Sequence, residues 1–428
     1  MKAAILAAGE GTRLRPFTFT RPKHLLPIVG KPLLQHTIES LKKIGVNEII
    51  AVIGYKEEMI RDYFQDGSKF GVKIEYINQK VIEGTAAAIK LVQNFINDDA
   101  FLLQYGDVLV PPESYPPLIK KYKEKKPSAI LSVREVDDPS KFGVIDPDGD
   151  NVKRIVEKPK PGTETSKLVN AGIYIFTPDI FDAIDETKKS KRGEYEITDS
   201  IQILIDRKKQ ILKYELPSWW KDIGLPWNLL EANQLLLPNL KYENNGTIED
   251  NVHINGDIGV GEGTIIKSGV YIEGPVLIGK KCVIGPNCYL RSYTVLEDDV
   301  RIGHACEIKG SLVMSGTRIP HLSYIGDSII GSNVNLGAGT ITANLRMDHR
   351  TIKATIKKEK IDTKKRKLGA IVGDNAQSGI GVTLMPGVIV GKNSAIAANM
   401  NVTHDVPSDT FVSPKQELIH KEWKIKKE

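Results

Sequence analysis

Aliphatic residues recur every six positions from Ile248 onward, and this period limits the possible folds more than any other feature of the chain. The first run is unbroken: Ile248, Ile254, Val260, Ile266, Ile272, Ile278, Ile284, Leu290, Leu296, Ile302 and Ile308. The series slips by one to Val313, Ile319 and Ile325, slips again to Ile330 and Leu336, and resumes through Val372, Leu384, Val390, Ile396 and Val402. An α-helix cannot keep such a period on one buried face. Short strands joined by tight turns can, because stacked repeats bury the aliphatic column.

Small residues follow several of these aliphatics at a distance of four positions: Cys282, Cys288, Thr294, Val300 and Cys306. Three cysteines cannot form a disulfide framework, and their spacing matches no zinc signature. We therefore expect the cysteines to fill small inward positions of the coil. The repeat resembles the left-handed parallel β-helix of the hexapeptide acyltransferases, and this resemblance implies their fold and a homotrimer.

The first half of the chain has a different pattern, in which Val/Ile/Leu-rich runs alternate with amphipathic ones. Strands are predicted over Lys2–Ala7, Glu48–Ile53, Lys73–Asn78 and Ala100–Tyr105, and helices over Pro32–Ile44, Lys56–Phe64 and Thr85–Phe95. This β-α-β-α order predicts a doubly wound, Rossmann-like α/β sheet with ligands at the carboxyl ends of its strands.

The predicted domains are an α/β domain at 1–235, a linker at 236–247, a β-helix at 248–410 with an insertion at 345–368, and a basic tail at 411–428. A chain of 428 residues with 41% hydrophobic and 26% charged residues fits two soluble globular domains. We expect no membrane span, because no run of about 18 apolar residues occurs. The apolar stretch at the N-terminus is too short for a signal peptide, so we expect a cytoplasmic protein. A net charge of +6 is modest, and we expect no nucleic-acid partner.

A glycine-rich string follows the first predicted strand: Gly9-Glu10-Gly11-Thr12-Arg13, with Arg21-Pro22-Lys23 ten residues further on. Glycines let the backbone approach phosphate oxygens, and Arg13 and Lys23 supply positive charge. Leu14 stands where a dinucleotide fingerprint needs its last glycine, and no Gly-Lys-Ser/Thr follows as in a Walker loop. The string predicts a phosphate site of another kind.

The whole string resembles the signature of the sugar-1-phosphate nucleotidylyltransferases, and further matches follow in that family's order over nearly all of residues 1–235. The resemblance assigns nucleotide binding to Leu6, Ala8, Gly9, Gly11, Thr12, Gln79, Gly84 and Thr85. It assigns the sugar phosphate to Gly143, Glu157, Lys158 and Asn170, and Mg²⁺ to Asp107 and Asp222. It implies that Arg13 and Lys23 are catalytic and that UTP or dTTP reacts with a hexose or hexosamine 1-phosphate. Charge neutralisation and in-line positioning dominate such chemistry.

The β-helix half contains two strings where the repeat changes phase, His321–Asp327 and Asn333–Asn344. They resemble the acetyltransferase half of the bifunctional enzymes that make UDP-N-acetylglucosamine. The resemblance implies acetyl-CoA as co-substrate and His321 as the general base on the amino group of glucosamine 1-phosphate. It places the sugar phosphate and acetyl-CoA at Arg291, Lys309, Tyr324, Asn335, Ala338 and Ser378.

Bacterial members of that family continue with Tyr-Asp after the position of Asn344, whereas this chain has Leu345-Arg346, and a later lysine is replaced by Arg350. These departures allow a broader or altered amino-sugar substrate. The favoured hypothesis is a bifunctional enzyme. One alternative is a monofunctional glucose-1-phosphate uridylyl- or thymidylyltransferase with an inert β-helix, and another is a regulatory subunit with degenerate sites.

Overall fold

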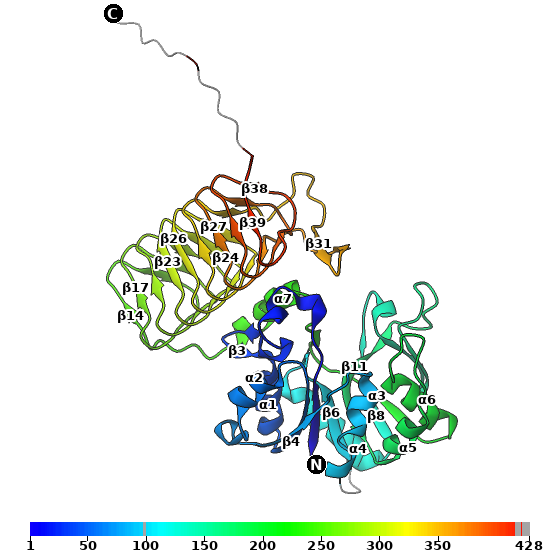
Figure 1. Ribbon diagram of the computed structural model, residues 1–428. Coiled ribbons are helices and arrows are strands. Elements are labelled where there is room, and N and C mark those ends of the chain that lie inside the picture. Colours follow the sequence, from blue (N-terminus) through cyan, green and yellow to red (C-terminus); the bar gives the residue numbers. More distant parts are fainter. Residues whose placement is uncertain (97–99, 416–420, 422–428) are drawn as a thin grey trace, which may run out of the picture. The chain divides into compact units, whose positions relative to one another are not determined.

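The computed structural model describes residues 1–96, 100–415 and 421, so most of the predicted tail at 411–428 lies outside the described residues. The chain divides into two compact units, Met1–Ala232 and Asn233–Glu428 (Figure 1). The division falls inside helix α7 (Trp227–Leu236). Within the described residues no helix is both long enough and apolar enough to cross a membrane.

The first unit is built on a nine-stranded mixed sheet with the order β5-β4-β1-β6-β11-β8-β12-β10-β9. Its strands are β1 (Ala3–Ala7), β4 (Glu48–Ile53), β5 (Lys73–Asn78), β6 (Phe101–Tyr105), β8 (Ala129–Glu135), β9 (Gly143–Asp148), β10 (Asn151–Glu157), β11 (Leu168–Phe176) and β12 (Ile211–Glu215). The neighbours β5, β4, β1 and β6 pair in parallel, so their carboxyl ends share one edge. β11 pairs antiparallel with both β6 and β8.

Helices cover both faces of this sheet (Figure 1). One hydrophobic core contains the apolar residues of α1 (Leu33–Lys43), α2 (Glu57–Phe64) and α4 (Tyr115–Lys125). The other core contains those of α3 (Thr85–Lys90), α5 (Asp179–Glu186) and α6 (Ile197–Asp206). The predicted doubly wound, Rossmann-like domain is therefore confirmed.

The predicted elements of this half are present with small shifts at their ends. The strands at 48–53 and 73–78 have the predicted bounds, while the other ends differ by one residue. The helix predicted over Thr85–Phe95 is the exception, because α3 ends at Lys90 and Gln93–Phe95 forms a separate 3-10 turn. Such a turn tightens the backbone and lets the buried Val92 face the core.

The second unit is a stack of short parallel strands in three sheets (Figure 1). The first face runs from β14 (Thr247–Ile248) to β39 (Phe411–Val412), the second from β15 (His253–Asn255) to β38 (Asn401–Val402), and the third from β16 (Ile258–Val260) to β36 (Ile389–Val390). The chain visits the three faces in turn, as in a parallel β-helix. The period of six thus predicts the strands of this unit.

The register between coils explains the phase slips in the sequence. Ile266 pairs with Ile284, so one coil takes 18 residues (284 − 266), or three repeats of six. Ile302 pairs with Ile319, a coil of 17 residues (319 − 302), which is the one-residue slip. Ile330 pairs with Val372, 42 residues later (372 − 330), because an inserted segment leaves the stack.

The inserted segment includes a two-stranded hairpin of β31 (Lys353–Ile356) and β32 (Glu359–Asp362). An isolated antiparallel bridge between Leu345 and Lys367 closes the segment at its base. The hairpin leaves the coil between Asn344 and Leu368, whose backbone N–H donates to the Asn344 carbonyl at 3.0 Å.

The predicted aliphatic columns form the core of the second unit, with Ile266, Ile284 and Ile302 fully buried. The three cysteines are free and buried in the same core, as predicted. Burial raises the pKa of Cys282 to about 11 and that of Cys288 to about 12, which keeps both thiols protonated at neutral pH. They fill space rather than react.

Candidate active sites

The glycine-rich loop follows the carboxyl end of β1, with Leu6 in the strand and Ala8 and Gly9 directly after it. Gly11 has a φ of +67°, and a Cβ there would lie 3.0 Å from the Lys23 Cβ. Only glycine takes this conformation freely and leaves room for Lys23. A short 3-10 turn, Thr12–Leu14, then carries Arg13. The loop therefore brings backbone amides and two cations to the same sheet edge, an arrangement suited to phosphate.

A charged centre forms beside this loop from four predicted residues: Arg13, Lys23, Asp107 and Asp222. Lys23 Nζ donates to Asp107 Oδ2, and both side chains are largely buried. Asp107 lies two residues after the end of β6, and Asp222 ends β13 (Lys221–Asp222), which pairs with β7 (Val108–Leu109). A Cβ on Gly224 would lie 3.0 Å from Asp222 Oδ2 and 3.2 Å from Arg13 Nη2. These two side chains are therefore neighbours.

The two carboxyl groups of this centre titrate in opposite directions. The charge and hydrogen bond of Lys23 outweigh burial and lower the pKa of Asp107. Burial, together with the negative charge of Asp107, raises the pKa of Asp222 to about 6. Two buried carboxylates close enough to repel are the donor set that a hard divalent cation prefers. The residues fit Mg²⁺, although the described chain gathers no third His, Cys, Asp or Glu beside them.

His24 belongs to the same region, and the sequence analysis did not single it out. Its ring is fully buried, and within the described residues neither ring nitrogen has a hydrogen-bond partner. Burial, reinforced by the Lys23 charge, lowers its pKa to about 3, so the imidazole is neutral. A Cβ on Gly106 would lie 3.0 Å from the His24 Cδ2. His24 thus packs directly beneath the strand end that carries Asp107.

A pocket of about 400 Å³ lies beside the glycine-rich loop, lined by Glu10, Gly54, Tyr55, Asn78, Gln79, Lys80 and Ile82. Gln79 is 6% exposed, and within the described residues its Nε2 has no hydrogen-bond partner. A buried hydrogen-bond donor without a partner destabilises the folded protein, and a ligand that brings an acceptor to it removes this cost. The carbonyl oxygens of a pyrimidine base are such acceptors.

Gly84 and Thr85 lie at the start of α3, where they contact the segment that leads into α6. Gly84 has a φ of +115°, and a Cβ there would collide with the backbone of Tyr195. Thr85 Oγ1 accepts from the backbone N–H of Ile197 at 3.0 Å. Tyr195 also donates its N–H to the Glu83 carbonyl at 2.7 Å. Tyr195 and Ile197 therefore form part of this wall, and neither was predicted from the sequence.

The predicted sugar residues come from three adjacent strands. Gly143 begins β9, Glu157 ends β10 and Asn170 lies in β11. A Cβ on Gly143 would lie 3.2 Å from Glu157 Oε2 and 3.5 Å from Asn170 Cβ, so the three residues meet. Lys158 Nζ lies 3.2 Å from Glu157 Oε1. A small residue at 143 leaves space where carboxylate and amide groups can bind hydroxyls.

Arg192 and Glu196 extend this cluster and were not predicted. Arg192 Nη1 lies 3.5 Å from Glu157 Oε1 and 3.1 Å from Glu196 Oε1. Burial and the Glu157 charge raise the pKa of Glu196. A glycine followed by acidic residues just before an amphipathic helix, Gly193 to Glu196, was the available sequence signal.

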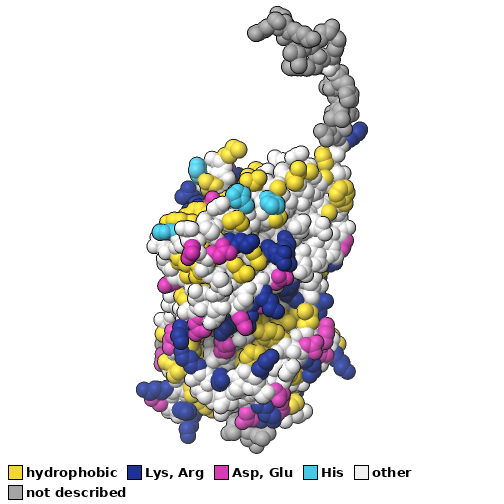
Figure 2. All heavy atoms as spheres, turned by 90° about the vertical axis from the view of Figure 1, so that its left-hand side faces the viewer, with side chains coloured by type: hydrophobic (Ala, Val, Ile, Leu, Met, Phe, Trp, Pro, Cys, Tyr) yellow, Lys and Arg dark blue, Asp and Glu magenta, His cyan; other side chains and the backbone are white. Residues whose placement is uncertain are grey.

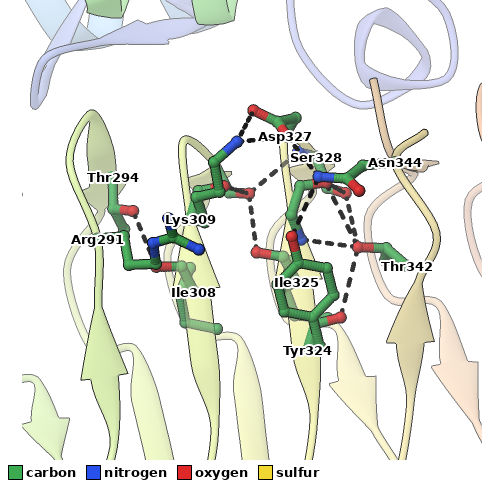
Figure 3. Close-up of polar contacts among 12 residues, drawn as sticks. Arg291, Thr294, Ile308, Lys309, Tyr324, Ile325, Asp327, Ser328, Thr342 and Asn344 are labelled. Atoms are coloured by element: carbon green, nitrogen blue, oxygen red, sulfur yellow. Dashed lines mark hydrogen bonds and ion pairs between the residues drawn. The ribbon is translucent and has the colours of Figure 1, made fainter. Parts of the chain in front are cut away.

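Three predicted residues of the β-helix unit lie on its second face, and Figure 3 shows them in one cluster. Arg291 follows β21 (Tyr289–Leu290), Lys309 ends β24 (Glu307–Lys309) and Tyr324 begins β27 (Tyr324–Gly326). Arg291 Nη1 donates to Glu307 Oε1 at 2.9 Å, and Lys309 Nζ donates to Asp327 at 2.8 and 2.9 Å. Both predicted phosphate ligands are thus paired with carboxylates of the same unit.

His321 lies at the end of β26 (Arg318–His321), on the turn from the first face to the second, in register with His304 of the preceding coil. Both imidazoles are exposed, and Figure 2 shows histidine side chains at the surface of the β-helix unit. Asn335, in β29 (Asn335–Leu336), faces outward on the first face, and Ala338 follows it. Predicted site residues therefore lie on two faces of the unit, in consecutive coils.

Ser378 is placed differently from the other predicted residues. It lies in β34 (Gln377–Ser378), in register with Leu336 of the buried column, and is 8% exposed. Its Oγ lies 2.9 Å from Thr340 Oγ1 and accepts from Gly337 N at 3.0 Å. The hydroxyl is engaged inside the coil.

The fold and the two clusters define a nucleotidyltransferase joined to a β-helix of hexapeptide repeats. The family model described as nucleotidyl transferase matches residues 2–239, and that of the GMPPB C-terminal domain matches residues 272–377. The bifunctional protein GlmU of Methanocaldococcus jannaschii is 45% identical, covering 99% of this chain and 100% of that protein. The bifunctional sugar-1-phosphate nucleotidylyltransferase/acetyltransferase of Sulfurisphaera tokodaii is 43% identical, covering 96% and 99%.

Among solved structures, a UDP-glucose pyrophosphorylase complexed with UDP-glucose is 30% identical with a TM-score of 0.51, covering 56% of this chain and 99% of that chain. The chain therefore belongs to the GlmU family of bifunctional sugar-1-phosphate nucleotidylyltransferases and acetyltransferases. Membership over almost the full length argues against both alternatives left open by the sequence, an inert β-helix and a regulatory subunit.

Proposed function

We propose that the chain acetylates glucosamine 1-phosphate with acetyl-CoA and then transfers a uridylyl group from UTP to the resulting N-acetylglucosamine 1-phosphate. The products are UDP-N-acetylglucosamine, pyrophosphate and CoA. The observation that carries the first unit's part is the convergence of Arg13, Lys23, Asp107 and Asp222 at the carboxyl ends of β1 and β6.

In the first unit a sugar phosphate oxygen attacks the α-phosphorus of UTP, and the bond to the β-phosphate oxygen breaks. Arg13 and the amides of the glycine-rich loop stabilise the departing pyrophosphate, and Lys23 stabilises charge at the reacting phosphorus. Asp107 and Asp222 would hold Mg²⁺, which when bound neutralises phosphate charge. Lys23 then exchanges its Asp107 partner for phosphate oxygens.

Substrate selection in this unit is assigned to two clusters. Gln79 Nε2 donates to a carbonyl oxygen of the base, and UTP and dTTP both offer one. Glu157 accepts hydrogen bonds from sugar hydroxyls, with Arg192 and Thr198 keeping its carboxylate in place at 3.5 and 3.3 Å. The departures at Leu345, Arg346 and Arg350 extend the range of amino-sugar phosphates that the second unit accepts.

In the second unit the amino group of the sugar attacks the thioester carbonyl of acetyl-CoA. His321 takes the proton from the attacking nitrogen, the C–S bond breaks, and CoA leaves as its thiol. The exposed imidazole is open to substrate. Arg291 and Lys309 bind the sugar phosphate, and Asn335 and Ala338 contact acetyl-CoA, while the Ser378 hydroxyl stays bonded inside the coil.

A homotrimer of left-handed β-helices in the cytoplasm completes the proposal. Predicted acetyltransferase residues occupy two faces of consecutive coils, and a neighbouring subunit would bring the two sets to one substrate. The inserted hairpin carries the basic run Lys364-Lys365-Arg366-Lys367 at its end, which is suited to the phosphates of CoA bound at such an interface.

The direct test follows CoA release from acetyl-CoA with glucosamine 1-phosphate and, separately in the same preparation, pyrophosphate release from UTP with N-acetylglucosamine 1-phosphate. We expect His321→Ala to lose CoA release and keep pyrophosphate release. His304→Ala is the matched control, because that histidine occupies the same register one coil earlier. No CoA release from the native chain with several amino-sugar phosphates would reduce the β-helix to an assembly domain.

A further inference from the structure

Asp327 is a buried carboxylate at the upper edge of the cluster in Figure 3, between Lys309 and Asn344, and it has no role in either proposed reaction. It follows β27 directly, has a φ of +47° and is 9% exposed. Its backbone is fixed on both sides, because its N–H donates to the Lys309 carbonyl at 2.8 Å and its carbonyl accepts from Gly369 N at 2.8 Å. The carboxylate is therefore held at one position on the second face.

Two donors converge on this carboxylate. Lys309 Nζ donates to Oδ1 at 2.9 Å and to Oδ2 at 2.8 Å. Asn344 Nδ2 donates to Oδ2 at 2.5 Å and also to the Tyr324 hydroxyl at 3.1 Å. Asp327 thereby links the predicted phosphate ligand to the asparagine that precedes the inserted hairpin.

The pairing determines how the Asn344 amide is oriented. A carboxylate can only accept hydrogen bonds, so the amide must turn its nitrogen toward Asp327. Both N–H groups are then used, by Asp327 and by Tyr324. The amide oxygen is left facing away from the carboxylate (Figure 3), with no donor among the described residues. Such an oxygen can accept from the N–H of an amino sugar.

The pairing also opposes phosphate binding at Lys309. The Asp327 carboxylate contacts the Lys309 ammonium and therefore lowers the net positive charge that a bound phosphate would meet. Substrate phosphate must share or displace this partner. Asp327 should therefore have opposite effects on substrate binding and on catalysis. It should weaken binding of the sugar phosphate at Lys309 and favour acetyl transfer by orienting Asn344.

We propose that Asp327 is a positioning residue for acetyl transfer, acting through Asn344 on the amino group and through Lys309 on the phosphate. This inference rests on the proposed acetyltransferase function. Because Asp327 touches neither reacting atom, its contribution must appear through those two residues.

The test compares kcat and KM for CoA release in the native chain and in Asp327→Asn. Asparagine tolerates the left-handed backbone, so the coil is preserved. We expect kcat to fall by about tenfold or more, since the Asn344 amide is no longer held in one orientation. KM for glucosamine 1-phosphate should stay equal or fall, because Lys309 loses its competing anion. A merely structural defect would not separate the two constants in this way.

A double-mutant cycle sharpens the test. If Asp327 acts through Asn344, Asp327→Asn combined with Asn344→Ala should lower kcat little more than Asn344→Ala alone. Additive losses would contradict the proposal. Asp299→Asn is the matched control, since Asp299 is also a left-handed corner residue, with φ +57°, paired with Arg318 at 3.2 Å.

The outcomes distinguish this inference from the function on which it rests. Denaturant unfolding of the second unit reports the folding of each variant, and pyrophosphate release by the first unit reports that the rest of the chain is intact. No CoA release from the native chain would defeat the proposed acetyltransferase. CoA release by the native chain with an unchanged kcat in Asp327→Asn, or with a raised KM at unchanged kcat, would overturn the role of Asp327 alone.

Discussion

The two units gather charged groups in different ways. In the first unit Arg13, Lys23, Asp107 and Asp222 meet at a buried point where strand ends converge. In the second unit Arg291 and Lys309 stand on the outer face of a sheet, each neutralised by a carboxylate, and His321 lies exposed on the turn from another face.

The difference follows from the two folds. A doubly wound sheet brings the carboxyl ends of several strands to one edge, so residues distant in sequence share one cleft. A β-helix buries its aliphatic columns and turns most of its charged side chains outward, so these side chains diverge from the axis. The first unit contains its proposed site within one subunit, and the second is expected to need a neighbour.

The largest expected effect tests the charged centre of the first unit. Lys23→Ala should lower UTP-dependent pyrophosphate release by about 10³-fold, because it removes charge from the reacting phosphates and leaves Asp107 without its buried partner. CoA release should be unchanged. Lys31→Ala is the control, since Lys31 lies in the same unit and pairs with Glu39 at 2.8 Å at the surface. Equal losses in both variants would contradict a specific role for Lys23.

The next effect concerns stability and uses two neighbours on one strand. Ile266 is fully buried in the column, while Ile265 is 39% exposed, and both belong to β17 (Ile265–Ile266). Ile266→Ala should destabilise the second unit by about 2–5 kcal/mol, and Ile265→Ala by less than about 0.5 kcal/mol. Denaturant unfolding followed on this unit measures both. Similar losses would contradict the inward-outward assignment.

A smaller effect tests whether the second site depends on charge from the inserted segment. Replacing Lys364, Lys365, Arg366 and Lys367 by glutamine should raise KM for acetyl-CoA by about tenfold at low salt, and less at high salt. KM for UTP should not move. An unchanged KM for acetyl-CoA in this variant would show that the inserted segment does not contribute to acetyl-CoA binding.

The smallest effect concerns Asp222, whose pKa is raised by burial and by Asp107 from 3.8 to about 6. The folded chain then holds a proton more tightly than the unfolded chain between about pH 4 and 6, so this group's contribution to stability falls as pH rises through that window. In chelator, Asp222→Asn should therefore be more stable than the native chain at pH 7, by on the order of 1 kcal/mol, and equal to it near pH 4. Thermal unfolding at both pH values measures this. A variant less stable at pH 7 would contradict the assignment.

The sequence predicted the two folds unequally well for physical reasons. The period of six determines which residues face inward, so Ile266, Ile302 and the cysteines could be placed before the structure. The early end of α3 at Lys90 could not, because helical propensity continues through residues 91–95 and tertiary packing decides the turn there.

The site residues divide in the same way. Residues within recognisable strings, such as Lys23 and Asp107, could be singled out from the sequence, and the structure brings these two side chains into contact. The role of His24 was not predictable, because a histidine beside a lysine has no special meaning in sequence. Asp327 ends the string His321–Asp327, but the string alone assigned it no role. Their roles depend on burial and on partners such as Lys309, which only the folded chain defines.

The central claim is that one chain carries two chemically independent sites. The most direct measurement follows conversion of glucosamine 1-phosphate, acetyl-CoA and UTP to UDP-N-acetylglucosamine by Asp107→Asn, by His321→Ala and by their mixture. We predict that the first variant accumulates N-acetylglucosamine 1-phosphate and that the mixture restores the nucleotide sugar. The second variant should convert none of these substrates, yet release pyrophosphate when N-acetylglucosamine 1-phosphate is supplied with UTP. Loss of both half-reactions in either single variant, with the fold intact, would contradict independent sites.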